Sequence, residues 1–129
     1  MTKTWLFVLT VASTIIVSAC SGPAKNFLSR HTFYDESGYS GPITFLDDSK
    51  VEIIGPTMKI IGTYTIGNVE SGEAGEEKQS LVMEYWYHGK AETVFYTVYI
   101  KSGFVTEIIG PASPPLAIKY GTKVKLSPA

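Results

Sequence analysis

Two pairs of neighbouring carboxylates are the residues of this chain whose types suit acid–base chemistry. The pairs are Asp35 with Glu36 and Asp47 with Asp48. A glycosidase or another acid–base enzyme needs two carboxyl groups that face one site. Adjacent residues of a strand point to opposite faces, and both pairs stand beside turn-forming residues. We therefore expect ordinary loop polarity at these positions.

The histidines, His31 and His88, give no further catalytic or metal pattern. A zinc site needs additional His, Cys or Asp side chains at ligand spacing. A nucleophilic triad needs a serine in a recognisable elbow between a strand and a helix. The sequence contains neither pattern, so we expect a protein that is not an enzyme and has no catalytic residue, metal or cofactor.

Segment 67–80 is charged and rich in glycine. Its carboxylates are of the type that calcium prefers, but their spacing matches no defined calcium loop. We expect a solvated, mobile hairpin tip instead. The glutamates in question are Glu70, Glu73, Glu76 and Glu77.

Cys20 is the only cysteine, and it follows a segment with the layout of a secretory signal peptide. Lys3 stands near the start, and an uncharged, mostly apolar run extends from Trp5 to Val17. That run has 13 residues, whereas a permanent membrane helix needs about 20. We therefore expect export and removal of residues 1–19.

The residues Val17-Ser18-Ala19-Cys20 resemble the lipobox of bacterial lipoproteins. The resemblance implies that the Cys20 thiol receives a diacylglycerol, that a peptidase cleaves between Ala19 and Cys20, and that the new amino terminus is often acylated. The alternative is a free cysteine behind an ordinary secretory signal. Two or three acyl chains would hold the protein on a membrane, whereas one chain binds only marginally.

Ser21 bears on which membrane would carry this anchor. In cells with two membranes, an Asp after the cysteine commonly retains lipoproteins at the inner membrane, so Ser21 favours the outer membrane. In a cell with one membrane, the same anchor places the domain on the outer face. The resemblance thus implies a lipid-anchored envelope protein in either case.

The remaining chain is long enough for one domain and too short for two. Removal of 19 from 129 residues leaves 110, divided into a lipidated cysteine and tether at 20–30 and a single β domain at 31–129. Without Lys3, ten basic residues stand against twelve acidic ones. This balance gives no electrostatic footprint for nucleic acid.

From residue 31 onward, runs rich in Val, Ile, Thr, Tyr and Phe indicate strands, and no segment has the periodicity of a helix. An all-β domain follows, either a small antiparallel up-and-down barrel or a two-sheet β-sandwich. The expected strands are 31–34, 42–46, 51–54, 58–66, 81–87, 93–101, 104–109, 116–120 and 123–126.

The hairpin around Gly89 and Lys90 defines two faces. If these residues form a type II′ turn, the inner face carries Leu81, Met83, Tyr85, Val94, Tyr96 and Val98. Trp86 and Phe95 are then diagonal neighbours on the outer face. Either a further layer covers them, or they form an exposed contact patch together with Glu84 and His88.

Three shorter segments predict connections between strands. Asp47-Asp48-Ser49 predicts a turn of undetermined register. A two-residue turn at Ser102-Gly103 would set Glu107 against Val98 in the core, so we expect a bulge. Segment 111–115, with three prolines, predicts an extended crossover along the surface.

Gly62-Thr63-Tyr64-Thr65-Ile66, followed after a loop by Leu81-Val82-Met83-Glu84-Tyr85, resembles the repeating core of bacterial lipocalin-like lipoprotein domains. The resemblance covers about residues 42–109. A ligand carrier of this kind predicts a small apolar ligand in an interior left partly hollow by Gly62 and the threonines. An interaction protein without a small-molecule ligand, such as an inhibitor of an attacking enzyme or an accessory subunit that binds an envelope protein, predicts a filled interior and exposed aromatics. A structural envelope component predicts no discrete site.

Overall fold

The computed structural model describes residues 24–116 and 122–129, and these residues form strands and turns without a helix. Buried and exposed residues alternate along the strands, and this pattern favours strands over helices because successive side chains of a strand point to opposite faces. The strands are β1 (Thr32–Asp35), β2 (Ile43–Phe45), β3 (Lys50–Ile54), β4 (Lys59–Ile66), β5 (Glu70–Ser71), β6 (Glu76–Tyr87), β7 (Lys90–Lys101), β8 (Phe104–Pro111) and β9 (Lys123–Pro128).

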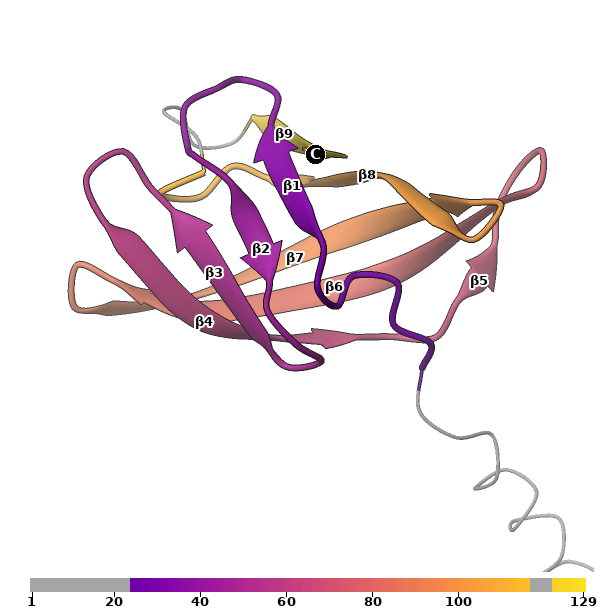
Figure 1. The fold of residues 1–129 in the computed structure, drawn as a ribbon, viewed down its shortest axis with the longest axis horizontal. Helices are drawn as coiled ribbons and strands as arrows, with labels where there is room; N and C mark the ends of the chain where they lie inside the picture. Colours follow the sequence, from indigo (N-terminus) through magenta and orange to yellow (C-terminus); the bar gives the residue numbers. More distant parts are fainter. Residues whose placement is uncertain (1–23, 117–121) are drawn as a thin grey trace, which may run out of the picture.

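Eight of these strands close into an antiparallel barrel (Figure 1). Neighbours in the chain are neighbours in the sheet, β4 pairs with β6, and β9 closes the ring by pairing with β1. The short β5 pairs with β6 outside the ring. The all-β, up-and-down barrel is thereby confirmed as a small lipocalin-like barrel, and the alternative β-sandwich does not form.

The β6–β7 turn consists of His88 and Gly89, so the predicted Gly89-Lys90 turn is wrong. Both turn residues have positive φ, 51° and 75°, which is the geometry of a type I′ turn rather than the expected type II′ turn. Leu81 therefore pairs with Tyr96 rather than with Val98. The pairing moves by two residues, and an even shift keeps every side chain on its face. The predicted inner face is confirmed.

The expected bulge between β7 and β8 is confirmed. The register shifts between Tyr99 and Ile100, so that Val98 pairs with Ile108 and Tyr99 pairs with Glu107. Glu107 consequently lies on the outer side of the barrel instead of against Val98.

Strand β6 begins earlier than expected, because Glu76–Ser80 pairs with β7 instead of belonging to the loop. Within this extension Gln79 points inward and is 1 % exposed. Its Nε2 donates hydrogen bonds to the carbonyl oxygens of Lys25 (2.8 Å) and Gly67 (2.9 Å). The predicted hairpin tip is therefore shorter than 67–80.

The segment before β1 lies against one end of the barrel. Residues 24–30, which we expected in the tether, include the fully buried Leu28. Asn26 Oδ1 accepts hydrogen bonds from the backbone N–H groups of Leu28 (2.8 Å) and Ser29 (3.0 Å). The chain is thus held on the barrel from Lys25 onward.

The segment after β8 covers the opposite end, so the expected surface crossover is wrong. Ala112 and Ser113 are 8 % exposed and Leu116 is fully buried. Tyr85 draws the segment inward, because its hydroxyl donates a hydrogen bond to the carbonyl oxygen of Pro114 and lies 3.3 Å from Ser113 Oγ. The expected strand 116–120 falls, after residue 116, outside the described residues.

Candidate functional site

The outer face of β4, β6 and β7 carries large apolar side chains that nothing in the described chain covers. Trp86 is 68 % exposed, Phe95 is 65 % exposed and Ile61 is 52 % exposed. Alternation places them there, because their neighbours in each strand point into the barrel. Of the two readings of Trp86 and Phe95, exposure is therefore the one that holds.

Trp86 and Phe95 are not diagonal neighbours, which corrects the expected patch. Trp86 pairs with Ala91, Glu84 pairs with Thr93, and Val82 pairs with Phe95. Ala91 and Phe95 are four residues apart on β7, about 13 Å along the strand. The two aromatics therefore occupy separate positions on the same face.

A shallow groove of about 360 Å³ lies beside Trp86. The side chains of Thr63, Ala91 and Thr93 are small and leave room for the groove. Ile61 and Trp86 form its apolar walls. Lys50, Glu84 and Glu92 also line it, so charged groups border an apolar centre. An aromatic anchor in an apolar patch with a polar rim is the arrangement found at protein–protein contacts. Of the candidate contact residues, the groove joins Trp86 with Glu84, whereas Phe95 lines a separate groove and His88 lies in the turn.

The barrel interior holds many large side chains, and the glycines that face it leave no room for a Cβ atom. A Cβ atom on Gly62 would lie 2.5 Å from the backbone carbonyl oxygen of Glu84 and 2.9 Å from Tyr85 Cβ, and one on Gly110 would overlap the ring of Tyr96. The space beside Gly62 is therefore taken by the backbone of β6 at Glu84 and Tyr85. The buried apolar cluster consists of Leu28, Phe33, Ile43, Phe45, Val51, Ile53, Ile60, Tyr64, Leu81, Met83, Tyr85, Val94, Tyr96, Val98, Ile100, Ile108, Ala112, Leu116, Val124 and Leu126.

Two buried polar atoms, the hydroxyl of Tyr96 and Oε1 of Gln79, have no hydrogen-bond partner among the described residues. Tyr96 is the one of the two that belongs to the apolar cluster. The side chain is 3 % exposed, and burial raises the pKa of its phenol well above the ordinary value. Tyr85, by contrast, has its hydroxyl bonded to the segment that covers the barrel end. The Tyr96 hydroxyl is thus an unused donor inside the barrel.

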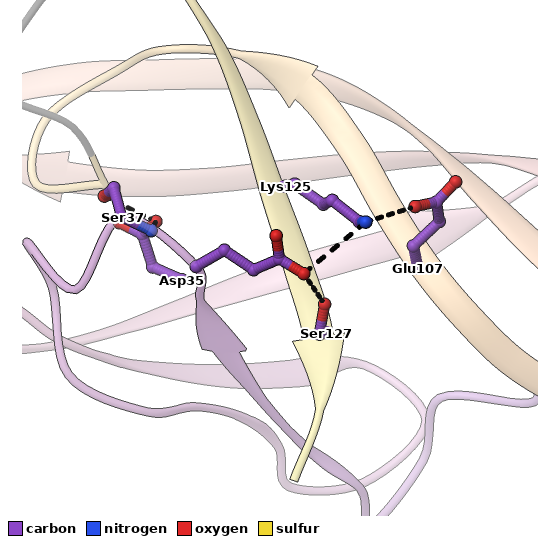
Figure 2. A network of polar contacts seen from close by, with 6 residues as sticks. Asp35, Ser37, Glu107, Lys125 and Ser127 are labelled. Carbon is purple, nitrogen blue, oxygen red and sulfur yellow. Dashed lines mark hydrogen bonds and ion pairs between the residues drawn. The ribbon is translucent and has the colours of Figure 1, made fainter.

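The carboxylate pairs have structural roles, as their positions beside turns predict. Asp35 is buried and accepts hydrogen bonds from Ser37 N (2.9 Å) and Ser37 Oγ (2.7 Å). Glu36 points elsewhere, to Ser127 Oγ (2.6 Å) and Lys125 Nζ (3.5 Å). Figure 2 shows Lys125 reaching on to Glu107, at 3.2 Å. The side chains of the pair therefore do not face one site.

The second pair builds the β2–β3 turn. Asp47 Oδ1 accepts hydrogen bonds from the backbone N–H groups of Ser49 and Lys50, each at 2.8 Å. These bonds hold the pKa of Asp47 below its ordinary value, because they favour the charged form. The expected turn is confirmed, with Phe45 paired to Val51 across it.

The histidines and the acidic segment stay apart from one another. His31 Nδ1 lies 2.9 Å from the carbonyl oxygen of Ser29, and the His88 ring packs edge-on against Tyr87. Within residues 24–116 and 122–129, no three His, Cys, Asp or Glu side chains gather as a metal site would require. Glu70 and Glu77 belong to strands of the β5–β6 hairpin.

Ile61 is the groove residue that the sequence did not single out. It follows Ile60, and two adjacent isoleucines do not reveal which one points inward. The position of Gly62 and Tyr64 could have identified it. Residues of even number in β4 face the core, so Ile61 must face outward. Ala19 and Cys20, the expected cleavage and lipidation residues, lie outside the described residues.

Comparison with protein-family models, with curated proteins and with solved structures finds no match. In the described part of the chain, no helix has the length and hydropathy to cross a bilayer. By its fold the chain is a small lipocalin-like antiparallel barrel. Its candidate site is the groove beside the exposed Trp86.

Proposed function

We propose that this chain is a lipid-anchored bacterial envelope protein that binds another envelope protein through the groove around Trp86, without catalysing a reaction. The observation that carries the proposal is the 68 % exposure of Trp86 beside an apolar groove on the outer face of the barrel. Large exposed apolar patches on soluble domains mark interaction sites, and tryptophan is among the commonest energetic anchors of interfaces.

The location of this function follows from the lipobox resemblance. The signal at 1–19 would export the chain, and acylation of Cys20 would hold it on a membrane. In a host with two membranes this is the outer membrane, and in a host with one it is the outer face of the cell membrane. Cys20→Ala should abolish labelling with radioactive palmitate and release the protein from membranes. Retained labelling would contradict the anchor.

Crosslinking in living cells of the native host tests the contact. A photoreactive phenylalanine analogue at position 86 should give one discrete crosslinked product. The same analogue at Tyr34, which is 49 % exposed on β1, should give none. Glu84→Lys beside the groove should weaken the product at position 86. Equal products at both positions, or none at position 86, would exclude the proposed surface.

A small apolar ligand inside the barrel is the second candidate, and the unpartnered hydroxyl of Tyr96 favours it. Native mass spectrometry of the protein, purified gently from membranes, separates the two. A non-covalent adduct of small-molecule size that disappears in Tyr96→Phe would identify a ligand carrier. A bare protein mass, together with the crosslink at position 86, supports the protein contact.

A structural envelope component without a discrete site is the remaining alternative. It predicts that the photoreactive analogue at position 86 gives no discrete product and that Trp86→Ala leaves the phenotype of the native host unchanged. A discrete product at position 86, together with a changed phenotype of a folded Trp86→Ala variant, would exclude it.

A further inference from the structure

A groove separate from those of Trp86 and Phe95 lies at the end of the barrel where the N-terminal segment is held, away from the β6–β7 turn. Its volume is about 650 Å³, and its apolar walls are Phe27, Phe33, Phe104 and Val105. Phe104 is 74 % exposed and stands directly after the β7–β8 turn. This end of the barrel therefore presents an aromatic side chain to its surroundings.

The length of chain between Cys20 and Lys25 limits how far a lipid on Cys20 can be from this end of the barrel. The carbonyl oxygen of Lys25 is fixed by Gln79 Nε2 at 2.8 Å. Lys25 is the fifth residue after Cys20, and five extended residues span at most about 18 Å. Trp86 lies seven residues beyond Gln79 on β6, about 23 Å farther along the strand. The anchor cannot reach the turn at the far end of the barrel.

Phe104 stands on the anchor side of this fixed point. Phe104 pairs with Lys101, and Lys101 pairs with Glu76. Glu76 precedes Gln79 by three residues, which is about 10 Å along the strand and directed away from Trp86. This offset is smaller than the reach of the tether, so Phe104 can meet the membrane surface that holds the lipid.

We propose that Phe104 enters the boundary between headgroups and acyl chains of the bilayer that carries the Cys20 lipid. This inference rests on the proposed anchor. Phenylalanine is among the apolar side chains with which peripheral segments enter that boundary, and the tether makes the contact intramolecular, which raises its effective concentration. The contact orients the barrel with the β6–β7 turn away from the membrane and leaves the Trp86 groove accessible to a partner.

The charges at this end specify the kind of lipid surface. Positive charge at this end comes from Lys25, Arg30 and Lys101. Negative charge comes from Glu76, which pairs with Lys101, and from its neighbour Glu77. The mixture gives no strong attraction to anionic lipid, which recruits clusters of basic residues. The contact is therefore aromatic, and a zwitterionic bilayer is sufficient for it.

Tryptophan fluorescence of the lipidated protein in phosphatidylcholine vesicles tests the proposal. Once Trp5 is removed with the signal, Trp86 is the only tryptophan of the natural protein. A second version combines Trp86→Phe with Phe104→Trp and moves the probe to the membrane-facing end. Each is compared in ordinary vesicles and in vesicles whose acyl chains carry bromine near the headgroups, because bromine quenches tryptophan on contact.

The tryptophan at position 104 should lose about half of its emission, as expected for a side chain about 5–10 Å into the boundary. Trp86 should lose almost none. Equal emission from position 104 in both kinds of vesicle overturns the inference. Mass spectrometry of the same samples reports the lipid on Cys20. A lipidated protein without quenching removes this inference alone, whereas an unlipidated protein removes the anchor and the inference together.

Discussion

Gly110 on β8 lies against the ring of Tyr96 on β7, so closely that a methyl group on Gly110 would overlap three ring carbons. Gly62 on β4 has a different neighbour, because a methyl group there would lie 2.5 Å from the backbone carbonyl oxygen of Glu84 and 2.9 Å from Tyr85 Cβ on β6. The ring of Tyr96 thus takes the space that a side chain at position 110 would need, whereas the absence of a side chain at position 62 lets the backbone of β6 approach β4 closely. Neither glycine leaves room for a Cβ atom.

Gly110→Ala should destabilise the fold by about 1–3 kcal/mol, because extra atoms in a packed core force side chains and backbone to move. Urea unfolding followed by circular dichroism measures the change. In a Tyr96→Val background the same substitution should cost much less, since the opposing ring is absent. An equal cost in both backgrounds would mean that the clash with Tyr96 is not the cause.

Tyr85→Phe and Tyr96→Phe should have opposite effects, although each removes one buried hydroxyl. The Tyr85 hydroxyl binds Pro114 and Ser113, so its loss should cost about 1–2 kcal/mol. The Tyr96 hydroxyl has no partner among the described residues, so its loss should be neutral or stabilising. Thermal unfolding of the two variants checks this. A destabilised Tyr96→Phe would reveal a bound water or ligand.

Trp86→Ala should leave stability within about 0.5 kcal/mol of the natural protein, since exposed positions away from structural features change it little. Tyr85→Ala, one residue earlier and buried, should cost about 3–5 kcal/mol. Chemical denaturation of both proteins makes the comparison. Similar losses would show that Trp86 packs against something in the folded domain.

His88→Asn should stabilise the β6–β7 hairpin by about 0.5 kcal/mol, because Asn-Gly is the preferred pair of a type I′ turn and tolerates positive φ. The gain is measurable as a higher midpoint of unfolding. His88→Val is the matched control and should destabilise, since β-branched residues are strained at positive φ. The Gly89-Lys90 turn expected from the sequence would predict no gain from asparagine.

Glu36 should titrate below its ordinary range. The hydroxyl of Ser127 lowers the pKa of this carboxyl most, and Lys125 lowers it further. A depressed pKa in the folded state stabilises the fold above the ordinary pKa of glutamate, and this contribution is lost as the pH falls through the folded value. Carbon-detected NMR titration should show the pKa rising in Ser127→Ala, and rising less in Lys125→Met. An unchanged pKa in Ser127→Ala would remove the assigned cause.

The sequence was sufficient for the all-β class, with the barrel as the leading architecture and the sandwich left open. It was also sufficient for the two faces of β6 and β7, because alternation of apolar and polar residues survives an even error in register. The sequence was insufficient for the β6–β7 turn, because a histidine at position 88 does not by itself indicate a positive φ. It also missed the start of β6, because Glu76 and Glu77 look like loop residues and are strand residues only through pairing with β7. The burial of Ser113 likewise depends on Tyr85, a contact distant in sequence.

The candidate site could be predicted in part. Exposure of Trp86 follows from the face assignment, but the separation of Trp86 from Phe95 required the true register. The groove itself depends on Thr63 from β4, which lies beside Glu84 only because β4 pairs with β6 across the loop between them. Periodicity within one hairpin carries no information about a strand outside it.

Closure of the barrel by β9 against β1 sets the order in which the fold can be completed. Phe33 pairs with Pro128 and Asp35 pairs with Leu126, so the ring stays open until residues from both ends of the domain meet. Such distant pairing slows folding, because the entropy of a long loop is lost before the contacts form. While the chain folds, one edge of β1 and one edge of β8 therefore stay unpaired and exposed to other chains until β9 joins them.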